Sequence, residues 1–313
     1  MKIAVLICTK DRPDKLIKLL HSLEPSAYDI KQIVIVSSGQ NVSDIIRQFA
    51  NKLDITYLHV NTPGQILQKK AGIKLVDPSI LWTLFLDDDV TVPIGAIDIL
   101  IKEYLLNVKY IEVVGFGLKI NGQKLKNFTN SQKFLLSLVG LYSNVPGSVL
   151  SSGHAQSYQS SNTDIATEWL NGISIWKTSC LSSYDPISSN IDYAAYEDVM
   201  FSYSISRKNQ LIFASRVEVM NQQIENYRSL NYSQYRAGAY MRLLFIDKHN
   251  GFSKIRLLIA QISRGLMYIN NGNYSDPFYK EIFRVNRIWF DIFFSMLIKR
   301  RLDDLVVLRF SKF

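Results

Sequence analysis

The chain of 313 residues has only two cysteines and four histidines. Cys8 and Cys180 lie far apart and belong to no CxxC pair, so the sequence offers neither a disulfide framework nor a zinc motif. No apolar run reaches the roughly 18–20 residues of a membrane span, so no transmembrane helix is expected. The short apolar run after Met1 is followed by no small-residue cleavage site, which argues against a signal peptide. Together with two thiols that are expected to be reduced, these absences predict a cytoplasmic location.

Residues 1–225 have no net charge, and the positive excess of the chain is confined to its C-terminal part. Residues 1–225 contain 21 basic and 21 acidic side chains, whereas residues 226–313 contain 15 basic and 6 acidic ones. The net charge of +9 therefore belongs to the last 88 residues. This asymmetry predicts two domains, residues 1–225 and 226–313, and an anionic surface as a partner of the second.

The first part of the chain alternates short apolar runs with segments of helical periodicity. This alternation is typical of an α/β fold, with a mostly parallel sheet covered by helices on both faces. The four runs expected to be strands are Ile3–Cys8, Ile33–Val36, Ile55–Val60 and Leu81–Leu86. Helices are expected to start at Pro13 and to cover Val42–Leu53 and Gln65–Val76.

Polar clusters follow three of these four strands. They are Thr9–Arg12, Ser37–Gln40 and Asp87–Asp89. Ligands of parallel α/β sheets bind beyond the carboxyl ends of the strands, so the three clusters are expected to converge on one crevice.

The rest of the chain has a weaker pattern. A strand is expected at Ile111–Ile120, followed by an irregular segment over 121–164. A helix at Tyr196–Arg207 and a strand at Leu211–Val219 come next. From Asn226 the pattern is helical, basic and rich in aromatic residues.

Three consecutive carboxylates repel one another unless a cation neutralises them. Side chains alternate along a strand, so Asp87 and Asp89 are expected to share a face while Asp88 points away. Such hard oxygen ligands suit Mg²⁺ or Mn²⁺, which then carries substrate phosphates. A solvated loop or a helix N-cap is the alternative for an acidic triplet.

Five motifs in order resemble those of the family-2 glycosyltransferases of the GT-A (Rossmann-like) fold over about residues 1–220. They are Ile7-Cys8-Thr9-Lys10-Asp11-Arg12-Pro13, Lys69-Lys70-Ala71-Gly72-Ile73, Phe85-Leu86-Asp87-Asp88-Asp89, Trp169-Leu170-Asn171-Gly172 and Tyr196-Glu197-Asp198. The C-terminal segment, expected to be a helical extension, lies outside the resemblance.

The resemblance implies inverting transfer of a sugar, of hexosyltransferase type, from a nucleotide-diphosphate donor, with a UDP-sugar favoured. It implies a glycan or a lipid-linked acceptor and a role in bacterial surface-polysaccharide synthesis. Asp89 is expected to bind Mn²⁺ or Mg²⁺, together with Asp87. The expected donor-binding residues are Thr9, Asp11, Arg12, Ser37, Lys69, Asp87 and Asp88. Asp198 is expected to be the catalytic base, with Glu197 beside it, and Trp169 and Gly172 are expected to contact the acceptor.

The chain also departs from the family pattern. Ser37 stands where the family commonly has an aspartate that reads the nucleobase, and Lys69 stands in place of the usual arginine. A histidine often found after the strand that follows the base helix is absent, and Asn221 or Gln222 lies nearby. For Lys69 a plain surface lysine is the alternative, and for Glu197 and Asp198 it is an acidic pair that complements a helix dipole.

Two other functions fit parts of the sequence. Residues 87–91, DDDVT, also match the pattern of haloacid-dehalogenase-like phosphatases, although that motif normally ends the first strand of its domain. A non-catalytic nucleotide-sugar-binding subunit is the second alternative. Residues 226–313, which include Phe283–Leu308 and the basic Lys299–Arg301, fit attachment at the inner face of the cytoplasmic membrane better than nucleic-acid binding. A helical cap on the catalytic domain is the alternative there.

Overall fold

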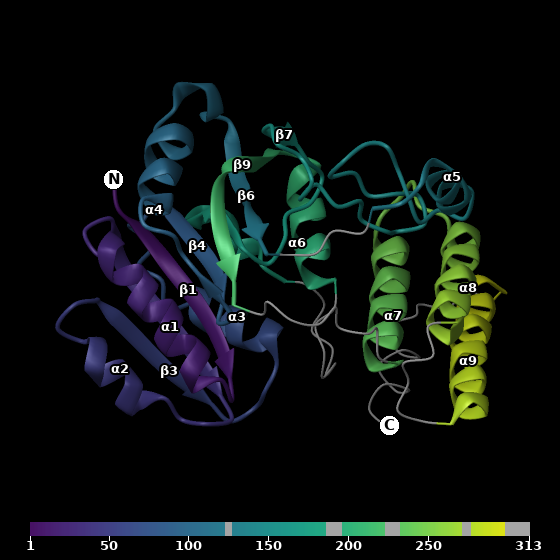
Figure 1. Ribbon diagram of the computed structural model, residues 1–313, viewed down its shortest axis with the longest axis horizontal. Helices are drawn as coiled ribbons and strands as arrows, with labels where there is room; N and C mark the ends of the chain where they lie inside the picture. The colour runs from purple at the N-terminus through teal and green to yellow at the C-terminus, as the bar shows by residue number, and fades with distance from the viewer. Residues whose placement is uncertain (123–126, 186–195, 223–231, 271–276, 298–313) are drawn as a thin grey trace. The chain divides into compact units, whose positions relative to one another are not determined.

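The computed structural model describes residues 1–122, 127–185, 196–222, 232–270 and 277–297 (Figure 1). The chain forms two compact units. The first consists of Met1–Leu125, Tyr158–Pro186 and Phe201–Glu225, and the second of Lys126–Ser157, Ile187–Met200 and Asn226–Phe313. A domain boundary at residue 225 stays a prediction, because compactness does not establish which segments fold independently.

The first unit is built on a nine-stranded sheet with the order β3-β2-β1-β4-β8-β6-β9-β5, and β7 pairs with β9. The strands β1 (Ile3–Lys10), β2 (Ile30–Ser38), β3 (Ile55–Val60) and β4 (Trp82–Asp87) are mutually parallel. Strands β6 (Val113–Asn121) and β9 (Gln210–Asn221) are also parallel, but β8 (Ser174–Lys177) runs antiparallel between β4 and β6. The short strands β5 (Val90–Thr91) and β7 (Ile165–Ala166) pair antiparallel with β9.

The helices of this unit follow the strands as the sequence predicts. They are α1 (Pro13–Leu23), α2 (Ser43–Phe49), α3 (Gln65–Ile73), the short α4 (Ala96–Ile99) with its π-helical continuation Leu100–Leu105, and α6 (Glu197–Ser206). Pro13 begins α1 at a position where a missing N–H costs nothing, and its residues Leu16, Leu19, Leu20 and Leu23 are all buried. Helix α6 contributes residues to both units.

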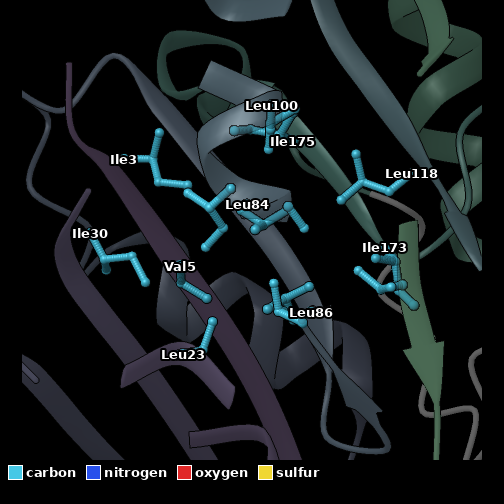
Figure 2. Packing of buried hydrophobic residues seen from close by; sticks show 14 of the residues in the cluster. Ile3, Val5, Leu23, Ile30, Leu84, Leu86, Leu100, Leu118, Ile173 and Ile175 are labelled. Atoms are coloured by element: carbon cyan, nitrogen blue, oxygen red, sulfur yellow. The ribbon is translucent and has the colours of Figure 1, made fainter. Parts of the chain in front are cut away.

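One apolar core joins the sheet and its helices. The strands β1 and β4 are buried almost throughout, as expected of parallel strands covered on both faces. Figure 2 shows the contacting side chains of this core, which include Ile3, Val5, Leu23, Ile30, Leu84, Leu86, Leu100, Leu118, Ile173 and Ile175. This rigid core fixes the carboxyl ends of β1, β2 and β4, where the predicted site residues lie.

The second unit is helical. Its long helices α7 (Tyr232–Lys248), α8 (Lys254–Asn270) and α9 (Phe278–Leu297) pack against one another (Figure 1). The expectation of an irregular segment over 121–164 was partly wrong, because it contains α5 (Asn130–Leu138). The predicted basic cluster Lys299–Arg301 lies outside the described residues. Within the described part of the chain, no helix is both long and apolar enough to cross a bilayer.

Candidate active site

The three polar clusters meet at the carboxyl ends of neighbouring strands, as the sequence predicts. The Thr9 hydroxyl, at the end of β1, donates a hydrogen bond of 2.8 Å to Asp88 Oδ2. Asp11 lies beside the end of β2, where its Oδ1 accepts a hydrogen bond of 2.8 Å from the Gln40 backbone N–H. Asp11 has a φ of 53°, and Gly39 opposite it has a φ of 71°, so a tight turn brings the two loops together.

Asp88 is the most buried member of the acidic triplet. Its side chain is 6% exposed, and its Oδ1 lies 3.0 Å from Arg12 Nη1. Burial raises the pKa of Asp88, and the bonds from Thr9 and Arg12 offset this only in part. Burial alone would lower the pKa of Arg12, but the neighbouring carboxylates raise it. Asp88 therefore fastens the triplet to the loop after β1.

Asp89 also contacts basic side chains, but more loosely. Its Oδ2 lies 3.4 Å from Arg12 Nη1 and 4.0 Å from Lys15 Nζ. The strand β4 ends at Asp87, so Asp88 and Asp89 belong to a turn. The alternation expected of a strand was therefore wrong beyond Asp87, and Asp88 and Asp89 share the same arginine.

Gln222 adds an oxygen next to the triplet that the sequence only hinted at. Its backbone N–H donates to Asp89 O at 2.8 Å, and its amide Nε2 donates to Val90 O at 2.7 Å. Its side-chain Oε1 is buried and has no hydrogen-bond partner among the described residues. Carboxylate and amide oxygens are the ligands that Mg²⁺ and Mn²⁺ prefer. The carboxylates of the triplet and the amide oxygen of Gln222 are therefore of the right kind to bind a divalent ion. Within the described segments, however, no three His, Cys, Asp or Glu side chains gather into a ready-made metal cluster.

Asp87 faces a different set of neighbours. Its Oδ1 accepts a hydrogen bond of 3.3 Å from Gln65 Nε2, at the start of α3. A Cβ added to Gly172 would lie 3.6 Å from Asp87 Oδ2, so the backbone before β8 approaches this carboxylate closely. The structure thus brings Gly172, which was predicted to contact the acceptor, beside Asp87, which was predicted to contact the donor.

At the end of β2, the predicted donor residue Ser37 is fully buried. Its hydroxyl lies 2.7 Å from the Tyr57 hydroxyl and 2.9 Å from His59 Nδ1. Tyr57 and His59 are only partly buried, so they present the polar surface of this strand end. Sequence reasoning missed both residues, although their alternating polar positions in β3 were a usable signal.

Helix α3 carries two buried polar side chains toward the sheet. Gln68 Nε2 donates to Thr9 O and to Val36 O, each at 2.9 Å, and so ties β1 to β2. Lys69 is 5% exposed, and its Nζ lies 5.7 Å from the centre of the Phe85 ring. The alternative of a plain surface lysine was therefore wrong. The sequence analysis did not single out Gln68, although a glutamine on the apolar face of a helix could have indicated a buried, hydrogen-bonded side chain.

Trp169 is held by its neighbours in the first unit. Its ring centre lies 4.9 Å from that of the buried Tyr158, and its carbonyl accepts from the Thr167 hydroxyl at 2.8 Å. Trp169 remains partly exposed, in contrast to the buried Trp176. This exposure leaves part of the ring available for contact with a sugar.

The acidic pair begins α6 and belongs to the second unit. Glu197 is 5% exposed, and Asp198 Oδ1 accepts a hydrogen bond of 2.8 Å from the Val199 backbone N–H. Tyr196, just before the pair, has the left-handed φ of 79°. A strained backbone at this point is typical of functional sites, although the acidic pair also complements the helix dipole.

A family of known proteins matches the part of the chain that contains the strand-end clusters. The family described as Glycosyl transferase family 2 matches residues 4–141. That range includes every predicted donor and metal residue but excludes Trp169, Gly172 and the acidic pair. No curated protein matches the chain significantly.

Solved structures of glycosyltransferases resemble the chain over most of its length. Mannosyltransferase PcManGT from Pyrobaculum calidifontis, solved with GDP-Man and Mn²⁺, has a TM-score of 0.54 at 10% identity, covering 96% of this chain and 88% of that one. S. aureus TarS 1-349 in complex with UDP has a TM-score of 0.51 at 14% identity, covering 84% and 70%. Glucosyl-3-phosphoglycerate synthase from Mycobacterium tuberculosis, with phosphoglyceric acid, has a TM-score of 0.50 at 11% identity, covering 80% and 81%.

The structural likeness, at this low identity, establishes the fold and confirms the predicted GT-A architecture with C-terminal helices. The family match over residues 4–141 adds a likeness to glycosyltransferases in the part of the chain that carries the strand-end clusters. The chain therefore has the GT-A fold, and its residues 4–141 resemble the family described as Glycosyl transferase family 2.

Proposed function

We propose that the chain is an inverting, metal-dependent hexosyltransferase that moves a sugar from a nucleotide-diphosphate donor to a hydroxyl of a glycan or lipid-linked acceptor. The observation that carries this proposal is the joining of the triplet to the end of β1 through Asp88, Thr9 and Arg12. This contact sets Asp87 and Asp89 at the strand ends where α/β proteins bind nucleotides. A role in bacterial surface-polysaccharide synthesis is part of the proposal.

The donor belongs to the first unit in this proposal. Asp89 and Asp87 would hold Mn²⁺ or Mg²⁺, which would neutralise negative charge on the leaving diphosphate. The loose contacts of Asp89 with Arg12 and Lys15 are readily exchanged for contacts with a metal ion and phosphates. Lys69 and Arg12 add positive charge, and Asp11 and Ser37 shape the nucleoside side. The UDP and GDP-Man bound by the similar structures support a nucleotide donor, of which a UDP-sugar is favoured.

The acceptor side rests on Asp198, Glu197, Trp169 and Gly172. Inversion requires one carboxylate to take the proton from the acceptor hydroxyl as that oxygen attacks the anomeric carbon. We assign this role to Asp198, with Glu197 supporting it, while Trp169 stacks on an acceptor sugar and Gly172 lets the acceptor approach the backbone. Loss of a general base typically costs about 10²–10⁴ in rate.

A thermal-shift panel of nucleotide diphosphates and nucleotide sugars, with and without Mn²⁺, tests the donor proposal. A ligand at a hundredfold excess over its Kd adds about 2.7 kcal/mol of stability, so the right nucleotide stands out. Asp89→Asn is expected to abolish the metal-dependent part of the shift. The matched control is Asp44→Asn, whose carboxylate is 84% exposed on α2. The absence of a shift with every nucleotide would refute the proposal.

Asp198→Asn separates an enzyme from a non-catalytic binding subunit. The variant is expected to keep the nucleotide-induced shift and to lose donor turnover, measured as release of nucleoside diphosphate. Unchanged turnover would show that Asp198 is not the base. Hydrolysis of a simple aryl phosphate without any need for a nucleotide sugar would instead favour the phosphatase alternative.

An anionic membrane is a further proposed partner, from a cytoplasmic location at the inner face of the membrane. Helix α9 exposes Phe283, Phe290 and Phe294 at fractions of 69%, 62% and 54%. Their spacing of seven and four residues places them on one helix face, next to basic residues such as Arg287. Aromatic and basic side chains combined on one helix are typical of interfacial membrane binding, and base-reading motifs of nucleic-acid binding are not evident.

A further inference from the structure

A row of hydrogen-bonded polar side chains runs along the ends of β2 and β3 and finishes at His59. The Tyr57 hydroxyl lies 3.0 Å from Asn41 Oδ1 and 2.7 Å from the Ser37 hydroxyl. It also accepts a hydrogen bond of 3.1 Å from the Val42 backbone N–H. The Ser37 hydroxyl in turn lies 2.9 Å from His59 Nδ1. The whole row belongs to the first unit, at the sheet edge where the candidate donor site lies.

The far end of this row fixes which atom donates at each step. The Ser43 backbone N–H donates to Asn41 Oδ1 at 2.9 Å, and an N–H needs an acceptor, so that atom is the amide oxygen. Tyr57 therefore gives its single proton to Asn41, and its oxygen accepts from Ser37. The Ser37 proton is then already used, so the Ser37 oxygen accepts a hydrogen bond from His59 Nδ1–H.

This order decides what His59 offers to a ligand. A neutral imidazole has one N–H, so a proton on Nδ1 leaves Nε2 as a hydrogen-bond acceptor. Among the described residues, the His59 ring makes a hydrogen bond through Nδ1 alone. Its side chain is partly exposed, whereas Ser37 is fully buried. The serine therefore cannot meet a ligand itself, but it orients a histidine that can.

His59 lies in the same row of the sheet as the residue that holds the acidic triplet. The register pairs Thr9 of β1 with Ser37 of β2, and Ser37 with His59 of β3. Paired positions of parallel strands point to the same face, so His59 lies two strand spacings, about 10 Å, from Thr9. Thr9 bonds Asp88, so a nucleotide with its diphosphate at the triplet can place its base along this row.

We propose that His59 Nε2 accepts a hydrogen bond from the nucleobase of the donor and so selects a base that has a ring N–H. Uracil offers N3–H and guanine offers N1–H, whereas the matching nitrogens of cytosine and adenine carry lone pairs that repel Nε2. This inference rests on the proposed function, because it requires a nucleotide donor. It assigns base recognition to His59, with Ser37 and Tyr57 as positioning residues.

Titration calorimetry of the full chain with UDP, CDP, GDP and ADP, in the presence of Mn²⁺, tests this selection. In the tighter-binding pair of pyrimidines or purines, UDP is expected to bind at least about tenfold more tightly than CDP, or GDP than ADP. His59→Phe keeps a ring but removes both nitrogens, so the two affinities of that pair are expected to become nearly equal. The matched control is His21→Phe, at a side chain that is 61% exposed on α1, and it is expected to keep the wild-type preference. CDP or ADP as the tightest ligand of the wild type would overturn the proposal.

Tyr57→Phe distinguishes an oriented acceptor from a ring that only packs against the base. Without the Tyr57 oxygen, the Ser37 proton turns to His59 Nδ1, and the imidazole proton moves to Nε2. The preference is therefore expected to reverse toward CDP or ADP. Ser37→Ala frees the ring from either constraint and is expected to reduce the preference without reversing it, which keeps a test available if Tyr57→Phe does not fold. A wild-type preference in Ser37→Ala would contradict the proposed order of donors.

Nitrogen NMR of the histidine-labelled chain without nucleotide reads the proton position directly. At pH 8, where histidine is ordinarily neutral, the proton of His59 is expected on Nδ1 in the wild type and on Nε2 in Tyr57→Phe. His59→Phe assigns the signal. A proton on Nε2 in the wild type, or nucleotides that bind without discrimination, would overturn this inference and leave the donor proposal intact. Failure of every nucleotide to bind would overturn both.

Discussion

At the scale of single residues, the three aspartates of the triplet differ in how deeply they are buried. Because burial raises the pKa of Asp88, the folded state favours its protonated form. Its contribution to stability is therefore fully present below the ordinary value of 3.8 and is lost as the pH rises through the raised pKa. At pH 7 its charge is costly to bury, and only the bonds from Thr9 and Arg12 compensate.

Because burial and these bonds oppose each other, replacing Asp88 by Asn and by Ala is expected to change stability differently. Asp88→Asn keeps an acceptor oxygen and avoids the cost of a buried charge, so the free energy of unfolding is expected to change by less than about 1 kcal/mol. Asp88→Ala leaves Thr9 without its acceptor and Arg12 with only the longer contact to Asp89, and is expected to cost about 1–3 kcal/mol. Urea unfolding at pH 7 measures both, and an Ala variant as stable as the Asn variant would contradict this reasoning.

The sequence predicted which residues would meet at the site better than it predicted their contacts. Chain order was sufficient to bring Thr9, Asp11 and the triplet together, because parallel strands end at one edge of the sheet. It did not show that β4 stops at Asp87, since a strand end depends on pairing with neighbours distant in sequence. For the same reason the sequence could not choose between Asn221 and Gln222, and only the fold shows that Gln222, 132 residues after Val90, bonds beside the triplet.

At the scale of elements, α3 depends on a small residue where it meets the sheet. A Cβ added to Gly72 would lie 2.3 Å from Leu6 Cδ1 and 3.0 Å from Val36 Cγ2. Gly72→Ala is therefore expected to push α3 away from β1 and β2 and to cost about 1–3 kcal/mol of stability. Because α3 also carries Gln68 and Lys69, nucleotide affinity should weaken as well.

Thermal unfolding and the UDP-induced shift measure the effect of Gly72→Ala. Lys74→Ala, at the exposed end of the same helix, is the control and is expected to change neither value appreciably. A Gly72→Ala variant with wild-type stability would show that Leu6 and Val36 can move aside without cost.

The sequence predicted best those elements whose buried apolar residues follow a regular spacing. The apolar runs form β1 to β4, and the regularly spaced leucines after Pro13 lie on α1. Helix α5 was missed although Phe134, Leu135 and Leu138 recur along it at helical spacing, and none of its residues is buried. Its start was nevertheless encoded locally, in the capping box of Thr129 and Gln132.

At the scale of the whole molecule, a buried histidine gives stability a pH dependence. The pKa of His154 is lowered by burial, so the unfolded chain binds a proton below about pH 6.5 that the folded chain does not. The contribution of neutral His154 to stability is thus fully present above that pH. On acidification the free energy of unfolding is expected to fall by up to about 1.4 kcal/mol per pH unit. Urea unfolding between pH 7 and pH 5 measures the slope, and His154→Gln is expected to be less steep. An identical slope in both proteins would assign the acid sensitivity to other groups.

The exposed aromatic face of α9 leads to a prediction about where the molecule resides. Sedimentation with phosphatidylglycerol vesicles at low ionic strength is expected to recover the protein, and added salt should release it because it screens the basic side chains. Burial of an aromatic ring contributes about 1.5–3 kcal/mol, so Phe290→Ser is expected to weaken the binding by roughly tenfold or more. Tyr28→Ser, which removes a ring that is 81% exposed in the other unit, is the matched control. Equal binding by both variants would mean that charge alone holds the protein, and no binding to anionic vesicles would leave the face of α9 without a membrane role.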